Sequence, residues 1–148
     1  MIEVQRETQA ATPDDAALER WAAAALSDAQ REVVLRFVDE GESRTLNRDY
    51  RGRDKPTNVL SFAFDPPAGF EDAHLGDLVI CTEVVEREAR EQGKSPEAHY
   101  AHMVVHGLLH LQGYDHEEPN EAQRMESLEI EILRRLGYDN PYEGDAEG

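Results

Sequence analysis

Cysteine is nearly absent from this chain of 148 residues, with Cys81 as the single one. An internal disulfide needs two cysteines, so we expect a reducing, cytoplasmic location. No apolar run approaches the ~18 residues that a membrane-spanning helix needs. The N-terminus has neither the basic start nor the apolar stretch of a secretory signal. These absences favour an intracellular protein that does not contact a membrane.

Basic residues are also scarce: 15 Lys and Arg stand against 32 Asp and Glu, which gives a formal net charge of −17. A protein that is acidic overall repels a polyanion, which argues against nonspecific coating of nucleic acid. The charge is uneven, however, because residues 44–55 are locally basic and residues 117–147 are strongly acidic. On charge alone, each run is typical of a solvated surface. The basic run gains meaning only if it lies beside a reactive site.

The length suits one domain, and hydrophobic residues make up 39% of the chain, enough to form a core. Residues 1–137 are predicted to form this domain and residues 138–148 an acidic, flexible tail. Strands and helices mix without strict alternation, so we expect α+β architecture with four strands and about five helices. The expected strands are 2–7, 33–38, 58–65 and 75–82, and the expected helices are 13–26, 39–50, 82–92, 96–112 and 120–136.

Three histidines lie at the end of the helix expected over 96–112 and in the turn that follows it. His106 and His110 are four residues apart, so they lie one turn apart on the same helix face. Gly113 permits a sharp turn that brings His116 back toward them. Three neutral imidazoles leave the fourth position of a tetrahedral Zn²⁺ open, as in catalytic zinc sites. The spacing predicts a zincin-like helix, with His106, His110 and His116 as ligands of Zn²⁺.

The spacing matches the His-Glu-x-x-His-x-x-Gly-x-x-His pattern of metzincin peptidases, except that Gly107 replaces the glutamate. That glutamate is the general base of those peptidases, so its absence argues against peptide hydrolysis. Two alternatives stay open: the histidines could be polar residues of a buried helix, and His102 forms a second such pair with His106. We assign His99 and His102 to packing or to support of the ligands.

The basic run leads into the strand expected over 58–65. A planar guanidinium can bind a phosphate at two points and offset the charge that develops on phosphorus oxygens. Arg51, Arg53 and Lys55 are therefore candidate substrate-binding residues for a phosphodiester. On spacing alone, the segment is also typical of a surface loop.

Three segments, 50–62, 75–80 and 106–116, resemble the bacterial YbeY endoribonuclease family, and the resemblance extends over nearly the whole chain. It implies a small α+β domain with a four-stranded mixed sheet, and a zinc-dependent endoribonuclease specific for single-stranded RNA. The enzyme would act in 3′-end maturation of 16S rRNA and in late ribosome quality control, with one Zn²⁺ per chain. The roles it implies are metal ligation by His106, His110 and His116, catalysis by Arg51 and His106, and contact of Asp77 with a small-subunit ribosomal protein.

The nucleophile stays open between water and the RNA's own 2′-hydroxyl, because no residue is an obvious general base. Bound zinc would supply a Lewis acid, and Arg51 would stabilise the developing charge. The alternative is a ribosome assembly factor with a mainly structural metal, which would dock through its acidic surface and Asp77. A third hypothesis is a hydrolase of another substrate, a peptide included.

Overall fold

The computed structural model describes residues 2–28, 30–66, 74–115 and 117–142. Each predicted helix and strand is found, and its ends differ from the prediction by at most two residues. In chain order the elements are β1 (Ile2–Glu7), α1 (Asp15–Ala25), β2 (Glu32–Val38), α2 (Glu40–Arg51), β3 (Val59–Ala63), β4 (His74–Cys81), α3 (Thr82–Gln92), α4 (Pro96–Leu111) and α5 (Pro119–Arg135).

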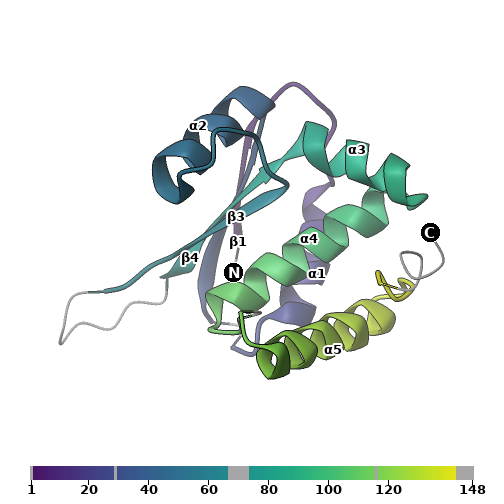
Figure 1. Cartoon of the computed structure of the whole chain (residues 1–148). Coiled ribbons are helices and arrows are strands. Elements are labelled where there is room, and N and C mark those ends of the chain that lie inside the picture. Colours follow the sequence, from purple (N-terminus) through teal and green to yellow (C-terminus); the bar gives the residue numbers. More distant parts are fainter. Residues whose placement is uncertain (1, 29, 67–73, 116, 143–148) are drawn as a thin grey trace.

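The strands form one four-stranded sheet in the order β1-β2-β4-β3 (Figure 1). Neighbours among β1, β2 and β4 run parallel, whereas β3 runs antiparallel to β4 at the edge of the sheet. The predicted α+β fold with a mixed sheet is therefore confirmed. The position of β3 matters for function, because an edge strand can line a surface cavity.

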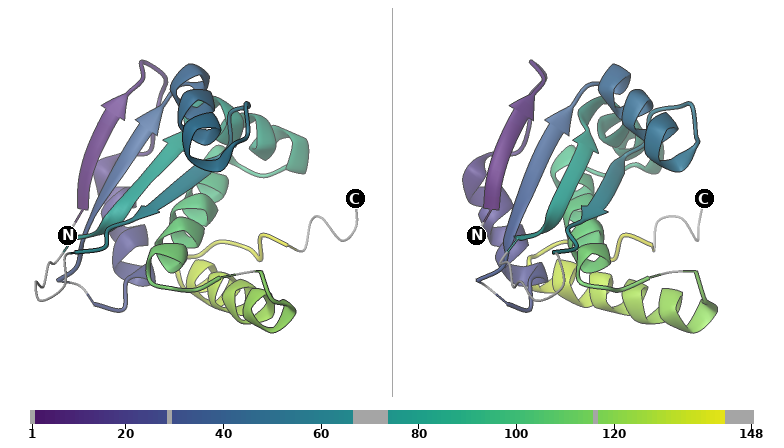
Figure 2. Two further views of the ribbon diagram at one scale, coloured as in Figure 1. Left: turned by 60° about the vertical axis from the view of Figure 1, so that its left-hand side comes forward. Right: turned by 90° about the vertical axis from the view of Figure 1, so that its left-hand side faces the viewer.

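Helices pack on both faces of the sheet. Side chains of a strand alternate between the faces, so Leu35 and Leu78 point into the main core, together with Trp21 of α1 and Leu108 of α4. On the opposite face, Leu46 of α2 packs against a small cluster formed by Val38, Leu60 and Val79. Figure 2 shows α2 on its own side of the sheet. α4 is consequently enclosed between the sheet and α5.

α4 begins as its sequence predicts. The Ser95 hydroxyl accepts a hydrogen bond from the Ala98 N–H at 3.1 Å, and Pro96 occupies the first turn. Most of its side chains are buried, as expected for a helix covered on nearly all sides. Polar side chains on such a helix need buried partners. The partners of the α4 histidines therefore help to define the site.

The segment after α5 packs onto the helices as far as it is described. The Tyr138 hydroxyl accepts from Trp21 Nε1 at 3.2 Å, and Lys94 Nζ donates to the Pro141 carbonyl. These contacts of residues 138–142 extend beyond the predicted domain end at 137, and residues 143–148 lie outside the described ranges. In the part of the chain that the structure describes, no helix has the length and apolar character to cross a membrane.

Candidate active site

A cavity of about 660 Å³ opens along the edge of the sheet beside β3. Its walls come from the end of α2, from β3 and the residues before it, from α4, and from the segment after α4. The lining residues are Tyr50, Arg51, 57–63, His106, His110, Asp115 and Glu117. Two distant segments of the sequence, the basic run and the histidine helix, therefore contribute to one cavity.

His106 and His110 lie one turn apart on α4, with ring centroids 4.8 Å apart. Both line the cavity. His116, the third predicted ligand, lies outside the described residues. Among the residues that are described, no group of three or more His, Cys, Asp or Glu side chains could hold a metal ion. The described part of the chain thus supplies two of the three predicted ligands.

Glu129 of α5 is a buried carboxylate, only 1% exposed, that contacts both His106 and His102. Its Oε1 lies 3.1 Å from His106 Nδ1 and 2.8 Å from His102 Nε2, and the Tyr142 hydroxyl is 3.0 Å away. Burial raises the pKa of Glu129, but the hydrogen bonds from His102 and His106 outweigh it and lower the pKa to about 2. An ionised carboxylate can only accept, so all these groups donate to Glu129.

This arrangement fixes the proton on one nitrogen of His106. Because Nδ1 donates to Glu129, Nε2 keeps the lone pair with which a neutral imidazole binds a metal. His102 differs, because its Nε2 is the atom that donates to Glu129, and burial lowers its pKa. The geometry therefore favours His106 with His110 over the alternative pair of His102 with His106.

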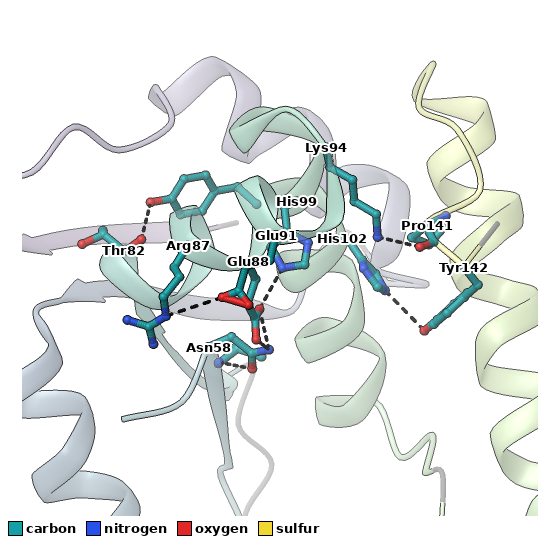
Figure 3. Close-up of polar contacts among 12 residues, drawn as sticks. Asn58, Thr82, Arg87, Glu88, Glu91, Lys94, His99, His102, Pro141 and Tyr142 are labelled. Carbon is teal, nitrogen blue, oxygen red and sulfur yellow. Dashed lines mark hydrogen bonds and ion pairs between the residues drawn. The ribbon is translucent and has the colours of Figure 1, made fainter. Parts of the chain in front are cut away.

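His99 has a separate carboxylate partner on α3. Its Nε2 lies 2.8 Å from Glu88 Oε1, and Asn58 Nδ2 donates to the same oxygen at 3.1 Å (Figure 3). Burial raises the pKa of Glu88, but hydrogen bonds from His99 and Asn58 leave it lowered overall. Figure 3 also shows His102 directed toward Tyr142, away from this pair. His99 thus connects α4 with α3 and the start of β3.

The sequence alone does not identify Glu88 or Glu129 as a partner of these histidines. Glu88 lies in a helix rich in exposed acids, where nothing distinguishes it. Glu129 did leave a signal: it is four residues after Met125 and four before Leu133, on the buried face of α5. A charged residue on an apolar face requires a buried partner, and that position could have been connected with the histidines.

Arg51 is the one member of the predicted phosphate-binding set that lines the cavity; Arg53 and Lys55 are exposed outside its lining. The turn after α2 separates them. Gly52 adopts a left-handed conformation with φ 70°, which residues with side chains rarely adopt. The buried Asn47 then donates to the Lys55 carbonyl at 2.8 Å. The structure thus distinguishes Arg51 from its basic neighbours.

Asp77 lies on β4, outside the cavity lining. Its side chain is 48% exposed, and its Oδ1 is 2.9 Å from His74 Nε2. In the sheet it pairs with Phe62, so it faces the same side as α2. A partner bound at Asp77 would therefore lie on the opposite face of the sheet from α4, which carries the histidine pair.

Gly107 occupies the position of the peptidase glutamate, and it faces the sheet. A Cβ at this position would lie 2.7 Å from Cδ2 of Leu78, a fully buried side chain of β4. α4 and β4 are too close there for a larger side chain without repacking of the core. This close approach gives a packing reason for glycine at position 107.

Comparisons with a family model and with related proteins all point to one family. A family model described as Endoribonuclease YbeY matches residues 2–137. A protein of Methylococcus capsulatus with that name is 60% identical over 141 residues, which cover 95% of this chain and 94% of its own length. One of Pseudomonas putida with the same name is 58% identical over 147 residues, covering 97% and 94%. A Thermotoga maritima protein with a known solution structure has a TM-score of 0.57 at 26% identity, covering 93% of this chain and 92% of its own.

Proposed function

Because this chain belongs to the YbeY endoribonuclease family, we propose that it is a zinc-dependent endoribonuclease that cuts single-stranded rRNA in the cavity beside β3. The observation that carries the proposal is the presence of Arg51 in the same cavity as His106 and His110. A phosphate-binding cation beside paired imidazoles suits a phosphodiester better than a peptide. The proposed biological role is 3′-end maturation of 16S rRNA and late ribosome quality control in the cytoplasm.

The described donors fit a zinc ion. Imidazole is a common zinc ligand, and carboxylate support of a ligating histidine recurs in metal sites. In the proposed set His106 and His110 hold the metal together with His116, and Glu129 keeps Nε2 of His106 available. When bound, zinc would supply a Lewis acid and lower the pKa of water toward ~7.

Arg51 is assigned to the phosphate. Its guanidinium can bind two phosphate oxygens and stabilise the charge that develops on them as phosphorus is attacked. Asp115 and Glu117 add carboxylates to the cavity lining, so groups that could accept a proton lie within the same hollow. Water and the 2′-hydroxyl remain the two candidate nucleophiles, and a 2′,3′-cyclic phosphate product would identify the hydroxyl.

We expect the purified protein, with its metal content verified, to cut a single-stranded fragment from the 3′ region of 16S rRNA and to spare the same sequence in a duplex. Removal of the metal with a chelator should abolish cleavage, and added Zn²⁺ should restore it, because the site is proposed to need the ion. Gel analysis of end-labelled RNA measures both. Cleavage that persists after the metal is removed, or that is equal on duplex RNA, would contradict the proposal.

Replacing Glu129 with glutamine should weaken zinc binding about 10- to 100-fold, the usual effect of losing a residue that orients a ligand. Glutamine keeps the size of the side chain but removes the negative charge that fixes the proton on His106. Chelator competition measures the affinity directly and does not depend on RNA cleavage. The fold is checked by thermal unfolding.

Glu88→Gln is the matched control, because Glu88 contacts a histidine of the same helix but not His106. This variant should bind zinc with wild-type affinity even if its stability falls. Equal affinities of the Glu129→Gln protein and wild type would contradict the assigned role of Glu129.

A contact with a small-subunit ribosomal protein at Asp77 is part of the same proposal. Its support is that the Asp77 side chain is half exposed and lies outside the cavity lining. Docking there would leave the histidine pair of α4, on the other face of the sheet, accessible to RNA.

A further inference from the structure

Tyr50 places an aromatic ring at the surface, in the last turn of α2. It is 68% exposed, and the other large hydrophobic residue exposed within the described ranges is Phe64 at 38%. A single exposed apolar residue is ordinary on a protein surface. The position of Tyr50 is less ordinary, because it lines the cavity that also contains Arg51 and the histidine pair.

Phe62 of β3 supports the Tyr50 ring. The ring centroids are 5.2 Å apart and the planes meet at 74°, an edge-to-face contact. In such a contact, the edge of one ring meets the face of the other. Phe62 can therefore cover at most one face of Tyr50. At least one face of Tyr50 is left by this contact for a flat ligand.

The backbone around Tyr50 is held by buried polar contacts. Asn47, one turn before it and 1% exposed, donates to the Lys55 carbonyl at 2.8 Å. The Ser43 hydroxyl donates to the Thr57 carbonyl at 3.1 Å and accepts from the Thr57 N–H at 3.0 Å. These bonds hold the loop of residues 52–58 against α2. Binding of a ligand at Tyr50 therefore orders little additional chain and loses little conformational entropy.

We propose that Tyr50, supported by Phe62, is a stacking site for one base of single-stranded RNA whose phosphate lies at Arg51. The inference rests on the proposed RNA substrate. Tyr50 and Arg51 both line this cavity, so a ring and a cation border the same space, as a base and a phosphate do in a nucleotide. Every nucleobase has a π face, so such a site is tolerant of sequence. Bases within a duplex are already stacked, and this gives the cavity a physical reason to prefer single strands.

The test measures RNA binding rather than cleavage. A labelled single-stranded RNA with 2′-O-methyl groups, verified as intact by gel, is titrated with the zinc-loaded protein and followed by fluorescence anisotropy. Tyr50→Ala should raise Kd about 5- to 150-fold, the fold-change that corresponds to the loss of one base–aromatic stack. Tyr50→Phe should bind as wild type does, because stacking requires the ring and not the hydroxyl.

Phe64→Ala is the matched control. Phe64 is also an exposed aromatic residue in edge-to-face contact with another ring, that of His74, but it lies outside the cavity lining. Its loss should leave Kd unchanged. A set of RNAs, each lacking one base, completes the experiment. One missing base should weaken wild-type binding by the factor seen for Tyr50→Ala, with no further loss in that variant.

The outcomes test the stacking site separately from the proposed nuclease function. Wild-type affinity of Tyr50→Ala, or equal losses in Tyr50→Ala and Phe64→Ala, overturns the stacking site. Binding that depends on Tyr50, in a protein that cleaves no unmodified RNA, supports the stacking site and contradicts the nuclease. A wild-type protein that binds no single-stranded RNA overturns both.

Discussion

His110→Ala is expected to remove bound zinc and RNA cleavage together. His110 lies one turn from His106, with ring centroids 4.8 Å apart, and the proposed site has three imidazole ligands. Loss of one ligand leaves two, too few for the sites in which zinc keeps a position for substrate or water. Metal content after dialysis and cleavage of single-stranded 16S rRNA should both fall to the level of a metal-free sample. His116→Ala should have the same effect.

His74→Ala is the control for this result. His74 is a partly exposed histidine on β4, outside the cavity lining, so its loss should leave both zinc content and cleavage unchanged. If His110→Ala retained zinc and wild-type cleavage, the metal assignment would be wrong. If it retained zinc but lost cleavage, His110 would act on the substrate instead.

Arg51→Ala is expected to slow cleavage roughly 10²- to 10³-fold, the usual effect of losing one group that stabilises charge in the transition state. Zinc affinity should not change, because Arg51 belongs to α2 and is assigned to the phosphate. Single-turnover cleavage rates and chelator competition separate the two effects. Arg51→Lys should restore only part of the rate, since an ammonium group cannot bind two phosphate oxygens in the guanidinium geometry.

Arg53→Ala gives the comparison for Arg51. It removes the same charge two residues further along the chain, from a side chain outside the cavity lining. We expect a small, salt-dependent loss of affinity and a near-normal maximal rate. Equal losses for both variants would mean that the basic run acts only through its overall charge.

Arg51→Ala also distinguishes the nuclease hypothesis from the assembly-factor hypothesis. A chain that acts mainly by docking should still correct ribosome defects in cells when it carries Arg51→Ala, but not when the charge of Asp77 is reversed. A nuclease should fail in the first case. Maturation of the 16S rRNA 3′ end is the readout.

Local sequence signals predicted most of the fold. Ser95 and Pro96 mark the beginning of α4, and Gly52 and Gly93 follow the ends of α2 and α3 in left-handed conformations. These signals act within one turn, so a single sequence is sufficient to read them. The strand order and the antiparallel direction of β3 depend on pairing between distant segments. The resemblance to a known family implied the four-stranded sheet but not its order.

In the candidate site, too, local features are predictable from the sequence and contacts between distant segments are not. The spacing of His106 and His110 is a local property of one helix, and the structure places both in one cavity. The carboxylate of Glu129 reaches His106 from 23 residues further along the chain. Nothing local connects the two. The separation of Arg51 from Arg53 and Lys55 also required the structure, because it depends on how the turn at Gly52 directs the chain.

The late position of Glu129 in the chain has a consequence for biosynthesis. Translation proceeds from the N-terminus, so α4 is made before α5 and before Tyr142. An unfinished chain that ends after α4 has its histidine pair but lacks the carboxylate that holds the proton on Nδ1 of His106. The proposed RNA-cutting site therefore reaches its oriented form only when synthesis is nearly complete.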